Sequence, residues 1–208
     1  MKKRESNYEI MRKQMQAHFA SYDLEAIRKQ WEMDQADGFM LVDFVGRSYR
    51  IDMENGAVLY EEDGEEREAD YNVCMTLYDI LTRKRQRSSG SFRLSSSFST
   101  VHLSSGNSSS GGFFRQAAEA FDHHDEELKK ACETLGGRPY GKGDVAYRIP
   151  LFQNLDMLLQ FWDSDEDFQA EVKLFCDENI LNFMHFETMM FMLSHVMERL
   201  TLLVTDQF

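Results

Sequence analysis

Residues 157–177 read MLLQFWDSDEDFQAEVKLFCD, and this stretch decides the expected fold. Two mainly apolar segments, MLLQFW and AEVKLFCD, lie on either side of a turn that holds four carboxylates at 163–167. Short apolar runs bounded by turn-forming residues are typical of β-strands, and aspartate and serine favour turns because their side chains bond to nearby backbone N–H groups. The stretch therefore predicts a β-hairpin with an exposed acidic turn.

The segments around this hairpin predict the rest of the C-terminal half. DVAYRIPLF at 144–152 reads as another strand. Before it, apolar side chains recur at helical spacing from 113 to about 135, and Gly136-Gly137 ends this long helix. After the hairpin, residues 182–204 present a strong apolar face and predict a final helix. The expected element order of this half is αβββα.

The N-terminal half repeats part of this order. Helices are expected at 8–22 and 24–32, the second with Asp23 as its N-cap. Three short strands follow in GFMLVDFVG, RSYRID and GAVLYEE, and Asn55-Gly56 predicts a hairpin turn because both residues accept positive φ. Asp70 then begins a helix that runs to about Lys84. The acidic stretch EEDGEEREAD leads into Asp70.

These elements predict an α+β fold in which antiparallel sheets pack with helices. We expect an N-terminal half at 1–87 and a C-terminal half at 113–208 that share one globular domain. Between them, twelve of the 25 residues at 88–112 are serine, which predicts a mobile loop, with FRLSSSFSTVHL as a poor edge strand. Because three strands and a helix occur in both halves, a duplicated βββα unit is a further hypothesis.

Composition excludes several classes of function. The formal net charge is -13, and such an acidic surface repels phosphate backbones, so we expect no nucleic-acid partner despite one basic run at 83–87. No stretch is long and apolar enough to predict a membrane span, and the N-terminus does not read as a signal peptide. Three scattered cysteines suggest reduced, buried thiols. Reduced thiols are typical of the cytosol, so we expect a cytoplasmic location.

The acidic turn is the candidate site. One interpretation is a solvated turn, because water screens the repulsion between its carboxylates. The other is a divalent cation site, in which Asp163, Asp165 and Glu166 act with His185 from the start of the final helix. Glu187 is a further candidate, although His185 and Glu187 diverge on one helix unless His185 precedes the first helical turn. The pattern matches neither an EF-hand loop nor HExxH, and no other cofactor is evident.

Histidines elsewhere have weaker functional signals. His185 and His195 lie on one stripe of the final helix, together with Thr188, Met192 and Arg199. This stripe could line a cleft, or it could be a half-buried flank of the helix. His123-His124 falls within the predicted long helix. Adjacent helical residues point about 100° apart, so the pair cannot chelate one ion from a single helix, and it reads as a solvated flank. The thirteen methionines indicate adaptable packing or a partner groove.

The C-terminal string from Tyr147 to Leu200 resembles an uncharacterised bacterial and archaeal family, domain of unknown function 3786. The residues that carry the resemblance are Phe161-Trp162-Asp163, Asp165-Glu166, Phe168, Asp177, His185-Phe186-Glu187-Thr188 and, in the first half, GRSYRI with the helix around 77–81. The resemblance implies no reaction. It implies an anaerobic cytosolic setting, with some relatives near iron–sulfur or corrinoid metabolism, and it adds Trp162 to the candidate site. Three cysteines cannot build a four-cysteine cluster alone.

Two functions from different classes remain open. No nucleophile elbow, phosphate-binding loop or dinucleotide-binding glycine pattern occurs, so the first is a binding module for a small molecule or a protein, without chemistry of its own. The second is a metal-assisted hydrolase that uses the acidic turn with His185 or Glu187. A homo-oligomer that assembles through the final helix is a third hypothesis. The sequence leaves open whether the protein is an enzyme.

Overall fold

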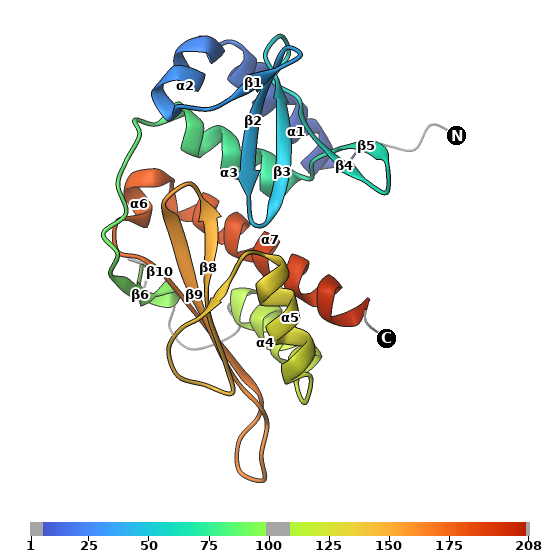
Figure 1. Ribbon diagram of the computed structural model, residues 1–208, viewed down its shortest axis with the longest axis vertical. Helices are drawn as coiled ribbons and strands as arrows, with labels where there is room; N and C mark the ends of the chain where they lie inside the picture. The colour runs from blue at the N-terminus through green and yellow to red at the C-terminus, as the bar shows by residue number, and fades with distance from the viewer. Residues whose placement is uncertain (1–5, 99–108, 207–208) are drawn as a thin grey trace. The chain divides into compact units, whose positions relative to one another are not determined.

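The computed structural model describes residues 6–98 and 109–206 (Figure 1). These residues form seven α-helices and two antiparallel sheets of five strands each, which confirms the α+β class. The chain divides into two compact units, an N-terminal unit of Met1–Gln86 with Leu181–Met192, and a C-terminal unit of Arg87–Ile180 with Leu193–Phe208. The duplicated βββα unit stays a prediction. Within the described ranges, no helix is long and apolar enough to cross a membrane.

The N-terminal unit contains a sheet in the order β1-β2-β3-β4-β5. Its strands are Gln35–Ala36 (β1), Phe39–Phe44 (β2), Arg47–Asp52 (β3), Val58–Glu62 (β4) and Glu65–Glu68 (β5). Met40, Val42 and Phe44 are buried, whereas Leu41 and Asp43 between them are exposed. Because successive side chains of a strand point to opposite faces, one face of the sheet packs against the core and the other meets water.

Helices complete this unit. They are Asn7–Ala20 (α1), Leu24–Trp31 (α2), Tyr71–Thr82 (α3) and the first residues of Phe186–Thr205 (α7). The predicted caps are confirmed, because Asp23 accepts a hydrogen bond from the Ala26 N–H and Asp70 accepts one from the Val73 N–H. Helix α1 packs against α3, and α2 also contacts α3.

The turn between β3 and β4 fixes the position of α1. Gly56 has a φ of +74°, and a Cβ atom there would lie 3.2 Å from both the Gln16 carbonyl oxygen and the Phe19 ring. Gln16 Nε2 donates a hydrogen bond to the Asn55 carbonyl at 3.3 Å, and the Tyr78 hydroxyl donates one to the Gly56 carbonyl at 2.8 Å. The glycine thus lets α1, the turn and α3 approach one another closely.

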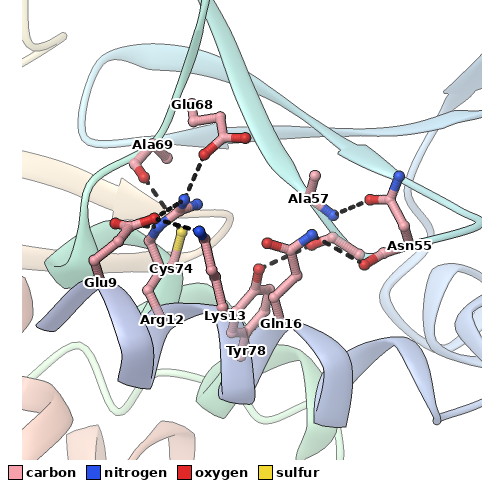
Figure 2. Close-up of polar contacts among 11 residues, drawn as sticks. Glu9, Arg12, Lys13, Gln16, Asn55, Ala57, Glu68, Ala69, Cys74 and Tyr78 are labelled. Carbon is pink, nitrogen blue, oxygen red and sulfur yellow. Dashed lines mark hydrogen bonds and ion pairs between the residues drawn. The ribbon is translucent and has the colours of Figure 1, made fainter. Parts of the chain in front are cut away.

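A buried arginine on α1 connects this helix to the sheet (Figure 2). The Arg12 side chain is only 6% exposed. Its Nε and Nη2 atoms donate to the Glu9 carboxylate at 3.1 and 2.7 Å, and Nη2 also donates to Glu68 at the end of β5. Cys74 of α3 lies below the guanidinium and donates to the Ala69 carbonyl at 3.6 Å. Arg12 therefore ties α1 to β5.

The C-terminal unit contains the second sheet, in the order β6-β10-β9-β8-β7. Its strands are Phe92–Leu94 (β6), Arg138–Pro139 (β7), Val145–Phe152 (β8), Leu155–Trp162 (β9) and Glu171–Asp177 (β10). Its helices are Ser109–Phe121 (α4), Asp125–Thr134 (α5) and the rest of α7, with the 3-10 turn Ser95–Phe98 (η1). The short helix Ile180–Phe183 (α6) crosses the division, because only Ile180 belongs to this unit. Helix α4 contacts β10 and α5 contacts β8. The predicted hairpin is confirmed, because Trp162 pairs with Glu171 and Met157 with Cys176.

Several expected elements differ from the structure. No strand was expected after GAVLYEE, but the acidic residues before Asp70 form the β4–β5 hairpin, because Asp63 and Gly64 adopt positive φ in its turn. In the predicted Asn55-Gly56 turn only Gly56 has positive φ. Within the edge strand predicted in 92–103, the described residues form a strand only at β6. Residues 99–108 of the predicted mobile loop lie outside the described residues.

Two expected helices also differ from the observed ones in where they begin or end. The single helix predicted for 113–135 is wrong, because the chain breaks between α4 and α5 and His123 has a φ of +60°. The final helix begins at Phe186 rather than at 182, after the separate short helix α6. Both breaks lie where an aspartate from another element accepts hydrogen bonds from the backbone, as described below.

Candidate functional site

The tip of the acidic turn is exposed and is organised by its own hydrogen bonds. Asp165 Oδ1 accepts hydrogen bonds from the N–H groups of Asp167 and Phe168, each at 2.8 Å. Glu166 and Asp167 are exposed, and Phe168 is 73% exposed. Asp165 therefore shapes the turn, which is what the solvated-turn interpretation expects of an aspartate at this position.

Asp163 faces the break between α4 and α5 instead. Its Oδ1 atom accepts a hydrogen bond from the His123 N–H at 2.7 Å, and its own N–H donates to Asp144 Oδ2 at 2.9 Å. Asp122, which also lies in this break, accepts hydrogen bonds from both the N–H and the hydroxyl of Ser164 at 2.8 Å. These bonds replace helical ones at 122–124, which explains why the predicted continuous helix does not form.

The break brings carboxylates and an imidazole together. One ligand atom each from Asp122, His123 and Asp163 lies within 4.8 Å of the others, and His123 Nδ1 is 4.0 Å from Asp163 Oδ2. His123 is 70% exposed, as expected of a solvated side chain, but it lies in the break between α4 and α5 and not on the flank of a helix. Hydrogen bonds from Ser164 lower the pKa of Asp122, so it is ionised at neutral pH. We call Asp122, His123, Asp125, Asp144 and Asp163 the acidic cluster.

Asp125 contributes a buried carboxylate oxygen to the acidic cluster. Burial, and then the neighbouring Asp163 carboxylate, raise its pKa. Its Oδ1 atom is buried and has no hydrogen-bond donor among the described residues. A buried carboxylate oxygen beside a second carboxylate can be satisfied by a proton or by a cation. The arrangement can therefore bind a hard or borderline divalent ion.

A hollow of about 770 Å³ adjoins the acidic cluster. Its lining includes Asp144, Trp162, Asp163, Asp165 and Lys173. The half-buried Trp162 ring lies 4.8 Å from the Lys173 ammonium, a cation–π distance. The C-terminal unit thus brings three of the predicted site residues, Trp162, Asp163 and Asp165, to one hollow.

His185 and Glu187 belong to the N-terminal unit. His185 precedes α7, and its backbone N–H and its Nδ1 atom contact the Asp79 carboxylate at 2.7 and 2.9 Å. Arg83 Nε donates to Asp79 Oδ1 at 2.9 Å. A side chain from α3 thus accepts a hydrogen bond beside the N-terminus of α7, and this contact explains why α7 begins after His185.

The surroundings of Asp79 favour its charged form. Burial alone would raise its pKa, but hydrogen bonds from His185, Arg83 and Thr188 outweigh this effect and lower the pKa. The predicted metal set of Asp163, Asp165, Glu166 and His185 combines residues of the two units. Within the N-terminal unit His185 is engaged by Asp79, and the shared metal site stays a prediction.

A cavity of about 460 Å³ lies next to Asp79 and His185, and we call it the helix cavity. Three parts of the N-terminal unit line it: α1 with the turn after it, α3, and the start of α7 with His185 before it. Their lining side chains are Met11, Met15, His18, Phe19 and Tyr22, then Tyr71, Met75, Tyr78, Asp79 and Thr82, then His185, Glu187, Thr188 and Phe191. The residues of α1 and α3 recur at helical spacing, so each helix presents one face to the cavity. Five aromatic rings and three thioethers dominate the lining.

The last predicted site residue lies elsewhere. His195 is 3% exposed, belongs to the part of α7 in the C-terminal unit and is not among the lining residues of the helix cavity. Of its predicted stripe, only His185 and Thr188 line the helix cavity.

A family model described as domain of unknown function (DUF3786) matches residues 23–199. The chain belongs to this family. The match confirms the resemblance expected from the C-terminal string and from GRSYRI. No curated protein and no solved structure matches this family member.

Sequence reasoning missed several residues of both sites. Asp122 and Asp125 were hidden in a segment that reads as helix, and Asp144 precedes a strand without any motif. Asp79 carried a usable signal, because it is the one charged residue of α3. A charged residue within a largely buried helix indicates a specific partner.

Proposed function

We propose that this family member is a binding module that holds a small, largely apolar molecule in the helix cavity, without chemistry of its own. The observation that carries the proposal is the lining, in which aromatic rings and methionines surround a small number of polar groups. Ligand sites commonly have volumes of about 300–1,000 Å³ and this balance of apolar and polar lining. The helix cavity, at about 460 Å³, falls within that range.

The exposed apolar surface of α1 and of the turn after it supports a ligand at this place. Met11 is 45% exposed and Tyr22 is 44% exposed, and both line the cavity. Methionine side chains are flexible and polarizable, so they adapt to ligands of different shape. A bound molecule would cover this surface and remove it from water, which favours binding.

The cysteines support the absence of nucleophilic chemistry. Cys74, Cys132 and Cys176 are all buried, and none of them forms a disulfide. Burial raises the pKa of each thiol to about 12. The thiolate is the reactive form, so none of the three is poised as a nucleophile. Free thiols of this kind also support a reducing, cytoplasmic location as part of the proposal.

Methyl NMR of methionine-labelled protein tests the ligand site. In a screen of small aromatic compounds, we expect binders to shift the methyl signals of Met11, Met15 and Met75, but not that of Met157, which is buried in β9. Met15→Trp fills the cavity and should weaken such binding by about tenfold or more, because it occupies the space a ligand needs.

A matched variant separates blocking from a general effect of the new ring. Gln14→Trp places tryptophan on an exposed position of the same helix, outside the cavity lining. It should leave binding unchanged. If no compound shifts the three methionine signals, or if both tryptophan variants bind as the wild type does, the helix cavity is not the ligand site.

A second candidate function is divalent cation binding at the acidic cluster, which a metal-assisted hydrolase would need. Two observations favour it: the ligand atoms of Asp122, His123 and Asp163 lie within 4.8 Å, and the buried Asp125 Oδ1 atom lacks a donor among the described residues. A bound cation would neutralise the negative charge of these carboxylates. The adjoining hollow would then hold the substrate.

Thermal unfolding tests the cation site. Mn²⁺ at one hundred times its Kd stabilises the wild type by about 2.7 kcal/mol and so raises its Tm, whereas Asp163→Asn loses this rise. Asp125→Asn should raise the Tm at pH 7 without metal, because a raised pKa means that ionising Asp125 in the fold costs free energy. That gain should fade at acid pH, where Asp125 is protonated in both states.

An exposed aspartate of the same turn provides the control. Asp167→Asn removes one carboxylate from the exposed tip and should keep the Mn²⁺ response of the wild type. An unchanged Tm in a panel of Mg²⁺, Ca²⁺, Mn²⁺ and Zn²⁺ would refute the cation site. An equal loss of response in Asp163→Asn and Asp167→Asn would show only nonspecific attraction to the acidic surface.

A further inference from the structure

Charge distinguishes the helix cavity from the other hollows of the protein. Two carboxylates, Asp79 and Glu187, line the cavity, and no lysine or arginine is among its described lining residues. By contrast, Arg115 and Lys173 line the hollow beside the acidic cluster. An anionic ligand would meet uncompensated carboxylate charge in the helix cavity, so the lining selects against anions.

The two carboxylates are not equivalent. Asp79 already accepts hydrogen bonds from His185 and forms an ion pair with Arg83, so its charge is offset within the protein. Glu187 is exposed in the first turn of α7 and forms no ion pair with the described residues. The negative charge available to a ligand is therefore that of Glu187.

Two aromatic rings line the cavity together with Glu187. The rings of Tyr71 and Phe191 lie 5.3 Å apart at an interplanar angle of 79°, and Tyr8 packs edge-to-face on Tyr71 at the same distance. Glu187 and Phe191 lie four positions apart on α7, so their side chains share one face of the helix, and both line the cavity together with Tyr71. Burial, and then the neighbouring Tyr8 and Glu187, raise the pKa of Tyr71. Aromatic faces attract cations through their quadrupole, and a carboxylate next to them adds direct attraction.

We infer that the ligand of the helix cavity is an organic cation, an apolar or aromatic body with an ammonium group. Its charged group lies against Glu187 and the rings of Tyr71 and Phe191, and its apolar body lies along Met11, Met15 and Met75. The inference rests on the proposed function and adds the chemical class of the ligand. The complementary charge and the aromatic rings identify the occupant, because neither favours an anion.

Three probes of similar size and different charge test this class. Phenyltrimethylammonium, benzyl alcohol and benzenesulfonate are titrated at equal ionic strength, and binding is followed by the methionine methyl signals. We expect the cation to bind about five times more tightly than the neutral alcohol, since one cation–π contact at a partly exposed site contributes about 0.5–1 kcal/mol and Glu187 adds to it. We expect benzenesulfonate to bind most weakly.

Two glutamate variants separate a local charge from the charge of the whole protein. Glu187→Gln should weaken binding of the cation by about threefold to tenfold and leave benzyl alcohol unchanged. Glu61→Gln removes the same charge from an exposed position on β4, outside the cavity lining, and should change neither affinity. Phe191→Leu keeps the apolar volume but should also weaken the cation, because the ring is lost.

The outcomes distinguish the inference from the function beneath it. If the cation and the alcohol bind equally, or if Glu61→Gln weakens the cation as much as Glu187→Gln does, the ligand class is wrong while the cavity still binds small molecules. If none of the three probes shifts the signals of Met11, Met15 and Met75, and the wider screen also finds no binder, both the inference and the proposed function fail.

Discussion

Replacement of Trp31 by alanine lowers the free energy of unfolding of the N-terminal unit by about 3–5 kcal/mol, the usual cost of removing a buried aromatic side chain. Trp31 is 0% exposed, at the end of α2. Its Nε1 atom donates a hydrogen bond to the Leu81 carbonyl of α3 at 3.0 Å. The substitution therefore leaves a large cavity and also an unsatisfied carbonyl group.

Denaturant unfolding followed by far-UV circular dichroism measures this loss. The chain has two tryptophans, so the fluorescence of Trp31→Ala reports only on Trp162 in the C-terminal unit. Trp31→Phe keeps most of the apolar volume and should cost less than half as much. A loss below about 1 kcal/mol for Trp31→Ala would contradict the packing described for α2.

Replacement of Asp79 by alanine should lower the free energy of unfolding by about 2–3 kcal/mol at pH 7, because hydrogen bonds to a charged acceptor contribute about 1.5–3 kcal/mol each and are partly replaced by water. The change leaves the His185 N–H and the Arg83 guanidinium without their acceptor. It also removes a polar group from the lining of the helix cavity, so probe binding should weaken together with stability.

The pH dependence identifies the charge of Asp79 as the cause. The pKa of Asp79 is lowered in the fold from its ordinary value of 3.8, so its contribution is fully present above that value and is lost as pH falls through the folded pKa. The difference in stability between the wild type and Asp79→Asn should therefore shrink as the pH falls below 3.8. Glu61→Ala, at an exposed position, should show no such pH-dependent difference.

Local patterns predicted most of the elements that local forces form. The β9–β10 hairpin, the caps Asp23 and Asp70, and the strands β2, β3 and β4 depend on alternation and on side chains within a few residues of the bond they make. Such interactions can be read from neighbouring residues. The short strands β1 and β7 carry too few residues to show alternation, and they were missed.

The candidate sites depend on contacts between distant residues, and there sequence reasoning reached only part of the answer. The break after Phe121 exists because Asp163, forty residues later, accepts the His123 N–H. Likewise Asp79 meets His185, which is 106 residues away. A periodic apolar pattern continues through 113–135 regardless of these partners, so no local signal marked the break.

The burial of the three thiols has a practical consequence for experiments on this protein. An alkylating reagent can reach a sealed sulfur only when the surrounding structure opens, so the labelling rate measures how often it opens. Cys74 lies in the N-terminal unit, whereas Cys132 and Cys176 lie in the C-terminal unit. Mass spectrometry of labelled peptides would thus time the opening of each unit separately, with no added probe.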